Sequence, residues 1–269
     1  MKFVAESVSA PSVNSNVRPP ISLIYGSLLR ADFTVLLRSG RSLLLNIAVP
    51  IVILVIVGLR HGSKANLLTA GGPAFVVGLA LTYGLMASSL MGYSITVARD
   101  RDAGVFQRLR VTPAPTWAIM SSRLVVQIVV DLIMTVVVAI VGVFIFDKFF
   151  SVGEYLLILC VSILGGAMFL AIAQAIVGLV RSATLVNAIG RILYIVLLLL
   201  GLLGSTGILG STMLTIANWS PVGAAINLYA GVFDLSSWDS TNTIGLIATL
   251  GYIIVGAFIG IRWFRWESR

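Results

Sequence analysis

Charged residues are scarce in this sequence, with 18 Lys and Arg and 10 Asp and Glu among 269 residues. Charge therefore accounts for only 10% of the chain, whereas hydrophobic residues account for 58% and the mean hydropathy is +1.05. A soluble domain carries roughly a quarter charged residues, and a disordered chain needs low hydrophobicity. The composition excludes both classes and predicts an all-α, polytopic membrane protein.

Histidine and cysteine each occur once, as His61 and Cys160. One cysteine cannot build a disulfide framework or a cysteine metal site, and one histidine leaves little metal or acid–base chemistry. The sequence GSTG at 204–207 resembles an intramembrane serine protease only faintly, because the serine needs a nearby base and His61 is expected in an outer loop. We predict no catalytic, metal-binding or cofactor-binding residue on this chain.

Lysine is also rare, and none of the three lysines follows a glycine. A phosphate-binding P-loop requires Gly-Lys followed by Ser or Thr. We therefore expect no ATP hydrolysis on this polypeptide, and an ATP-driven activity would need a separate subunit.

Long apolar stretches dominate the rest of the chain. A bilayer-spanning helix needs about 20 mainly apolar residues. The sequence predicts six transmembrane helices, at about 42–59, 73–97, 117–146, 155–180, 191–208 and 240–261. They belong to a single transmembrane domain, 21–269, behind a polar segment, 1–20, that is predicted to be a disordered cytoplasmic N-terminus without a cleavable signal.

The segment 21–38, directly ahead of the first span, has an amphipathic helical pattern. One face carries Tyr25, Leu28, Leu29, Phe33 and Leu36. Arg30 and Arg38 lie elsewhere on the helix, and this arrangement is typical of an N-terminal interfacial amphipathic helix. A soluble helix packed on a partner is the alternative, but the span that follows almost at once favours the interface.

One uncharged stretch, Ile192–Phe233, is 42 residues long, which is too long for one span and tight for two. Glycines recur at three-residue spacing at 201, 204, 207 and 210, and Ser220-Pro221 follows. This density of helix breakers favours a re-entrant outer segment at about 209–232, between spans five and six. A close helix–helix contact face made of small residues is the alternative.

The positive charges predict the orientation of the spans. With six crossings, 15 of the 18 Lys and Arg residues fall on the side of both termini. The other side holds only Arg60, Lys64 and Lys148. Because the positive side of a membrane protein faces the cytoplasm, both termini are expected to be cytoplasmic.

The segment 98–117 between spans two and three is unusually charged for this chain. As a helix over about 99–110, it places Asp102, Val105, Phe106 and Leu109 on one face, with Arg101 and Arg108 flanking them. A short helix cannot bury such a face alone, so the pattern indicates a docking surface. A solvated loop that merely obeys the positive-inside rule is the alternative, and it would not explain the apolar face.

This segment also carries a resemblance. Gly104-Val105-Phe106-Gln107-Arg108-Leu109 followed by Val111-Thr112-Pro113 resembles the coupling helix of type-2 ABC transporter permeases, with the drug-resistance exporters most similar. Arg181-Ser182 with Asn187-Ala188 resembles their second cytoplasmic loop, and the segment 218–225 resembles the region after their outer re-entrant segment. The chain departs from the usual pattern in having aspartates for glutamates, Val105 for threonine and Gln107 for glutamate.

The resemblance implies a membrane-spanning permease subunit of an ATP-driven exporter in the cell membrane. It implies a separate ATP-binding subunit that carries ATP and Mg, a second permease chain in a homo- or heterodimer, membrane lipids as surroundings and no nucleic acid. The substrate would be lipophilic or amphipathic. The residues expected to contact the ATP-binding subunit are Arg101, Asp102, Gly104, Val105, Phe106, Arg108, Leu109 and Arg181. A polysaccharide- or teichoic-acid-exporting permease and an ion-coupled carrier are the alternatives.

Asp131 is the one acid expected near the middle of a span, and Gln127 lies one turn before it on the same face. An intramembrane carboxylate is costly and is a functional candidate by default. We interpret the pair as a hydrogen bond between helices, because the resemblance makes the third span peripheral to the pathway. A role of the charge in transport is the alternative.

Overall fold

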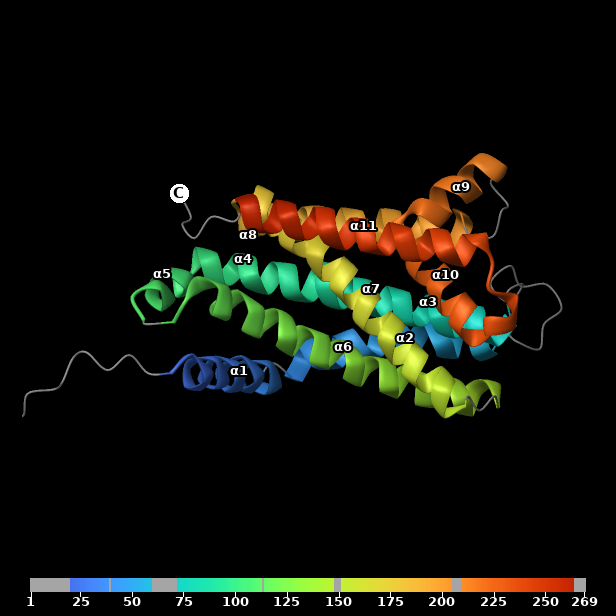
Figure 1. Cartoon of the computed structure of the whole chain (residues 1–269), viewed down its shortest axis with the longest axis horizontal. Helices are drawn as coiled ribbons and strands as arrows, with labels where there is room; N and C mark the ends of the chain where they lie inside the picture. The colour runs from blue at the N-terminus through green and yellow to red at the C-terminus, as the bar shows by residue number, and fades with distance from the viewer. Residues whose placement is uncertain are drawn as a thin grey trace, which may run out of the picture.

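The computed structural model describes residues 20–38, 40–59, 72–112, 114–147, 151–204 and 210–263, and all regular structure in these ranges is helical. The long helices lie side by side in a bundle (Figure 1). The predicted N-terminal segment 1–20 lies almost wholly outside the described residues.

Five of the described helical segments are long and apolar enough to cross a membrane. The first of them is continuous through α3 (Gly72–Ala87), the π-helical turn η2 (Ser88–Tyr93) and α4 (Ser94–Asp102). The others are α6 (Thr116–Phe146), α7 (Val152–Leu179), α8 (Ala183–Leu199) with η3 (Leu200–Gly204), and α11 (Ser240–Trp263). The chain is therefore an all-helical, multi-pass membrane protein.

Two helices precede these five. Helix α1 (Ile21–Arg38) occupies the range expected for the interfacial helix, and it packs against α6. Helix α2 (Gly40–Leu59) occupies the range of the first predicted span and packs against α3 and α6. The described apolar part of α2 is only Ile47–Ile56, so α2 is not among the five, and the six-span topology stays a prediction.

Two helices extend beyond the predicted spans. The second span was expected to end at residue 97, but its helix continues to Asp102. The charged side chains of its last turn are stabilised there, because Arg101 and Asp100 form hydrogen bonds with groups on other helices. The fifth span was expected at 191–208, but its helix begins at Ala183. Arg191 therefore lies inside this helix and not ahead of it.

The glycine-rich region ends the fifth span and leads into two short helices, α9 (Ser211–Trp219) and α10 (Pro221–Phe233), ahead of the turn η4 (Leu235–Ser237). A Cβ at Gly201 would lie 2.4 Å from Val222, so this glycine permits close packing of the fifth span on α10. Gly210 has φ +92°, a left-handed conformation that suits glycine. The region therefore contains both a glycine that breaks the helix, Gly210, and a glycine in a close helix–helix contact, Gly201. Gly207 lies outside the described residues.

The Ser220 side chain caps the N-terminus of α10, where Pro221 is the first helical residue. Helix α10 is almost entirely buried against α3, α7 and α11, whereas α9 is mostly exposed. Neither helix has the length of a full crossing, which takes about 20 residues.

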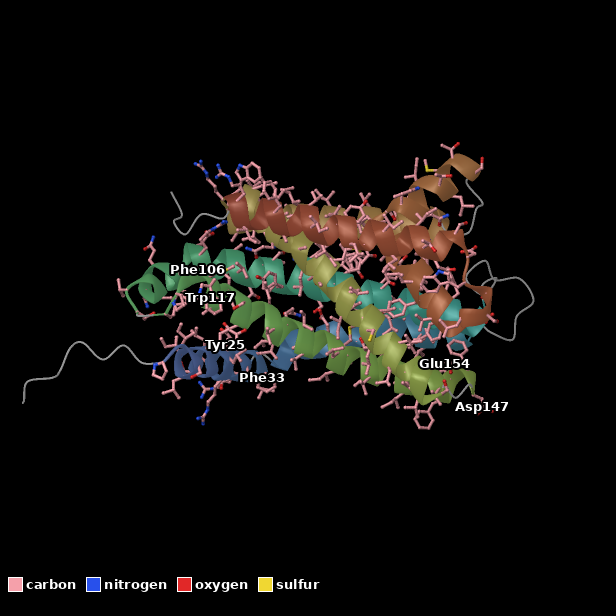
Figure 2. The ribbon with its side chains drawn as sticks, in the orientation of Figure 1. Tyr25, Phe33, Phe106, Trp117, Asp147 and Glu154 are labelled. Carbon is pink, nitrogen blue, oxygen red and sulfur yellow. The ribbon has the colours of Figure 1, made fainter. Side chains whose placement is uncertain are left out.

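The described charged residues differ in kind between the two ends of the bundle. One end, called the basic end here, holds α5 (Val105–Arg110), the start of α6 and the α7–α8 turn, with Arg99, Arg101, Arg108, Arg123 and Arg181. Figure 2 shows Phe106 and Trp117 at this end, with Asp147 and Glu154 at the opposite end. The described charged residues near that opposite end are acidic: Asp147, Glu154, Asp234 and Asp239.

Candidate functional site

The predicted coupling helix 99–110 is not one helix, and this expectation was wrong. Helix α4 ends at Asp102 and α5 covers only Val105–Arg110. Between them Gly104 has φ +70°, and its N–H donates to the carbonyl of Arg101 at 3.0 Å. A left-handed glycine is a common helix terminator, so the chain turns here and α5 packs beside the end of α4.

The expectation that Phe106 is exposed was also wrong, because its side chain is 0% exposed. It belongs to the hydrophobic core, and the Arg123 guanidinium lies 4.7 Å from the centre of its ring. A cation over an aromatic face is attracted by the negative charge of that face. Phe106 thus anchors α5 inside this chain. Val105 and Leu109, from the same predicted face, are partly buried.

Arg123, near the start of α6, joins three helices of the basic end. Its Nη1 donates to Asp100 Oδ2 of α4 at 2.5 Å, and its Nε lies 4.0 Å from Asp32 Oδ1 of α1. The hydroxyl of Ser122 donates to Asp32 Oδ2 at 2.5 Å. These bonds fasten the N-terminal helix α1 to the bundle. The stacked rings of Tyr25 and Trp117, 6.3 Å apart, extend the same contact.

The pKa of Asp32 is raised above its ordinary value because burial disfavours the charged carboxylate. The hydrogen bond from Ser122 and the charge of Arg123 oppose this effect without overcoming it. The contact between α1 and α6 therefore includes a carboxylate whose ionised form is destabilised by burial.

Arg101 was expected to flank an exposed face, but its side chain is only 2% exposed. Its Nη1 donates to the carbonyl of Val177 at 2.9 Å, and its Nη2 donates to the carbonyls of Val180 and Arg181 at 2.9 and 2.6 Å. The last carbonyls of a helix lack internal donors and carry partial negative charge. Arg101 therefore caps the C-terminus of α7.

The next residue, Asp102, reaches the following helix. Its Oδ2 accepts the N–H of Ala183, the first residue of α8, at 3.1 Å. An acidic side chain at a helix N-terminus satisfies a free N–H and matches the helix dipole. Arg101 and Asp102 together, called the α4 clamp here, hold both sides of the α7–α8 turn.

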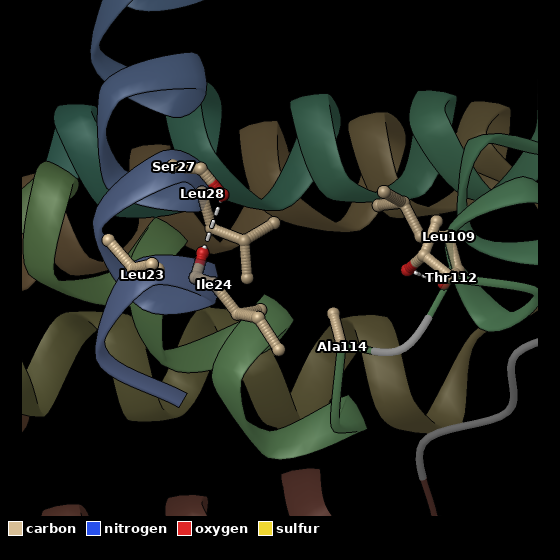
Figure 3. Close-up of a pocket in the computed structure, with 7 residues that line it drawn as sticks. All are labelled: Leu23, Ile24, Ser27, Leu28, Leu109, Thr112 and Ala114. Carbon is tan, nitrogen blue, oxygen red and sulfur yellow. Dashed lines mark hydrogen bonds between the residues drawn. The ribbon is translucent and has the colours of Figure 1, made fainter. Parts of the chain in front are cut away.

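The remaining predicted contact residues, Arg108 and Arg181, are exposed on the surface of the basic end. Val111, which was not predicted as a contact residue, is 88% exposed. Beside them is an apolar cavity of about 330 Å³ between α1 and the α5–α6 connection. Figure 3 shows its lining, which comprises Leu23, Ile24, Ser27, Leu28, Leu109, Thr112 and Ala114.

The two hydroxyls that line this cavity are already used. Ser27 donates to the carbonyl of Ile24 at 2.8 Å and Thr112 donates to the carbonyl of Leu109 at 2.6 Å, as dashed lines in Figure 3 mark. Bonded to their own turns, these hydroxyls leave a lining that suits an apolar side chain.

The structure brings Gln127 and Asp131 together with a serine of the second span. The hydroxyl of Ser88, in η2, donates to Asp131 Oδ1 at 2.5 Å, and Gln127 Nε2 donates to the Ser88 oxygen. Asp131 is 1% exposed and its Oδ2 has no hydrogen-bond partner among the described residues. This geometry joins α6 to η2, so the group can act as a polar contact between helices.

The sequence did not identify Asp32 and Asp100 as partners of Arg123, or Ser88 as the partner of Asp131. Asp100 precedes Arg123 by 23 positions and Ser88 precedes Asp131 by 43, so no local spacing connects them. Within the described residues no group of three His, Cys, Asp or Glu side chains could hold a metal ion. The basic end thus combines capped helix ends, part-buried ion pairs that are satisfied within the chain and an apolar cavity.

The fold and this end define a multi-pass helical membrane protein with a basic, contact-forming surface. Residues 25–233 match the family model described as ABC-2 type transporter. The chain therefore belongs to the ABC-2 type transporter family and is a membrane subunit of an ABC transporter. Members of this family are membrane components that typically work with an ATP-binding subunit.

A relative from Bacillus subtilis (strain 168), named "Putative transport permease YvfS", is 24% identical to this chain over 174 residues. The matched region covers 64% of this chain and 69% of the relative.

Proposed function

We propose that this chain is the permease subunit of an ATP-driven exporter that moves a lipophilic or amphipathic molecule out of the cell. ATP and Mg are expected on a separate subunit, and a second permease chain completes the pathway. The family membership, whose matched residues 25–233 run from α1 to the end of α10, is the observation that carries this proposal.

The proposed topology has six spans in the cell membrane, with α2 as the first and with both termini in the cytoplasm. The charge difference between the two ends supports this orientation, since positive residues favour the cytoplasmic side. We propose α9 and α10 as the re-entrant segment, because both are too short to cross and α10 is buried within the bundle.

The surface for the ATP-binding subunit is proposed to be the exposed side of α5 with the cavity beside it. Arg108 and Val111 are exposed there, and the cavity would take an apolar side chain of the partner. The α4 clamp would pass a displacement of α5 on to α7 and α8, because Arg101 and Asp102 bind both helices directly. Phe106 would act from inside, by fixing α5 to α6.

The test is co-purification of the permease with its ATP-binding subunit, together with transport in vesicles. Arg108→Glu combined with Val111→Asp should reduce both, because it changes only exposed positions of the proposed surface. Val152→Asp is the matched control, since Val152 is 78% exposed near the opposite end. Normal co-purification of the double variant would place the partner elsewhere.

An ion-coupled carrier remains the competing function. Such carriers gather several polar groups at mid-membrane, with ion sites at interrupted helices. In the described spans, the buried polar group that contains a carboxylate is formed by Ser88, Gln127 and Asp131. Ser88 already donates to Asp131, and Gln127 already donates to Ser88. Transport that persists without ATP but collapses with the proton gradient would favour the carrier.

A further inference from the structure

Arg191 has an unusual position for an arginine in this chain. It lies eight residues after Ala183, the start of α8, and therefore about 12 Å along the helix axis. Its side chain is exposed on a helix that belongs to a candidate span. A guanidinium on the exposed face of such a helix is costly in hydrocarbon unless it meets water, an anion or lipid headgroups.

Arg191 is part of a polar stripe along α8. Thr184, Asn187, Arg191 and Tyr194 are spaced three, four and three residues apart, so they share one helix face. Thr184 is exposed as well, and Asn187 Oδ1 has no hydrogen-bond partner among the described residues. The adjoining exposed face of α8 is apolar, with Leu185, Ile189, Ile192, Val196 and Leu199. The helix thus presents two chemically different faces outside the bundle.

A second stripe lies on α4. The span from Phe75 to Asp102 is the most buried of the five, and its few exposed residues include Thr96 and Arg99. These two are three residues apart and share a face. Neither Arg99 nor Arg191 has an ion pair or hydrogen bond of its side chain within the described part of the chain.

Helices α4 and α8 are antiparallel neighbours. Asp102 contacts Ala183 at the basic end, and a Cβ on Gly190 would lie 2.7 Å from the carbonyl oxygen of Leu90 and 3.8 Å from the hydroxyl of Ser94. This register sets Arg99 beside Thr184 and Thr96 beside Asn187. Arg101 points from α4 toward α7, so right-handed helix geometry places both stripes on the other side of the pair. We call their combined surface the α4–α8 stripe.

We propose that the α4–α8 stripe binds the oxyanion headgroup of an amphiphilic substrate, with Arg99 and Arg191 as the binding cations. The guanidinium fork matches phosphate and carboxylate oxygens, and Thr96, Thr184 and Asn187 supply further donors. The apolar face beside the stripe indicates that the occupant has a hydrophobic tail and is not a free anion. This inference rests on the proposed transport function and narrows its substrate class to anionic amphiphiles.

The test uses the permease with its ATP-binding subunit in nanodiscs of zwitterionic phosphatidylcholine. The probes are two pyrene-labelled amphiphiles with the same tail, one with a phosphate head and one with a trimethylammonium head, and inorganic phosphate as competitor. The phosphate-headed probe should bind more tightly than the trimethylammonium-headed probe, and this difference in affinity should shrink as the salt concentration rises. Arg191→Gln and Arg99→Gln should each weaken its binding roughly tenfold without weakening binding of the cationic probe.

Arg262→Gln is the matched control, because Arg262 is an exposed arginine in the last turn of α11. It should leave probe binding unchanged, and Arg191→Glu should reverse the headgroup preference. Equal loss in Arg262→Gln would mean that surface charge or bilayer headgroups act in general, which overturns the proposal. No headgroup preference in the wild-type complex, or full competition by inorganic phosphate, overturns it as well.

Failure of this inference is distinguishable from failure of the proposed function. Loss of headgroup preference in a complex that co-purifies and hydrolyses ATP refutes the α4–α8 stripe alone. Absence of any association with an ATP-binding subunit refutes the proposed function.

Discussion

One buried carboxylate, that of Asp131, joins α6 to the second span. Asp131 Oδ1 accepts the Ser88 hydroxyl at 2.5 Å and lies 3.4 Å from Gln127 Nε2. Ser88 is buried, so its hydroxyl would lose its bond without the Asp131 acceptor, whereas Gln127 would keep its bond to the Ser88 oxygen. The carboxylate oxygen and the serine hydroxyl therefore need each other for the packing of these helices.

Asp131→Asn should be nearly silent, because the carboxamide oxygen still accepts the Ser88 hydroxyl. Asp131→Leu should destabilise the protein by about 1–3 kcal/mol, since it leaves the buried Ser88 hydroxyl without its acceptor. Thermal unfolding in detergent and transport in vesicles measure the two effects. If Asp131→Asn abolished transport in a normally folded protein, the charge itself would be required and the structural interpretation would be wrong.

Asp32 gives the α1 contact a pH dependence. Because burial raises its pKa in the folded protein, the folded state holds this proton to a higher pH than the unfolded state does. The stability that Asp32 adds is therefore greatest below its ordinary pKa and falls as pH rises through the raised one. Lowering the pH from neutral to about 4 should raise the melting temperature of the wild type relative to Asp32→Asn. A constant difference would show that Asp32 does not titrate in this range.

At the scale of elements, the α4 clamp connects segments that the chain separates widely. Arg101 and Val177 are 76 residues apart in sequence, yet the guanidinium spans the end of α7 and Asp102 caps the start of α8. A movement of α5 and α4 therefore moves the α7–α8 turn as well.

Arg101→Lys keeps the charge but replaces the planar fork by a single ammonium group, which cannot reproduce the bonds to three carbonyls. We expect lower thermal stability and a marked fall in transport, with binding of the ATP-binding subunit largely kept because its proposed surface is untouched. Arg30→Lys, on the exposed side of α1, serves as the control. Unchanged transport in Arg101→Lys would remove the clamp from the coupling pathway.

At the scale of the whole molecule, the two charged ends predict the orientation. In a Cys160→Ser background, a cysteine introduced at Ser182 should be labelled only from the cytoplasm and one introduced at Ser237 only from outside. The background is needed because Cys160 is exposed on α7. Labelling of position 182 from outside would refute the proposed topology.

The sequence by itself determined the class of the protein and the ranges of most helices. Apolar length and the spacing of charges are local properties, so they predict the ranges of α6, α7 and α11 closely, with α7 beginning earlier, at Val152, and α11 ending later, at Trp263, than expected. The resemblance of the segment around Gly104 to the family was likewise readable without coordinates, because a motif depends on order along the chain.

Which charges are buried and which are exposed depends on tertiary contacts that the sequence does not reveal. Arg101 and Arg191 look alike in sequence, yet one is 2% exposed and bonded to α7, while the other is exposed along α8. Phe106 is buried and not offered to a partner, since α5 turns at Gly104 onto α6. The physical reason is that burying a charge or a ring requires complementary groups on other helices, and their identity depends on contacts between segments many residues apart.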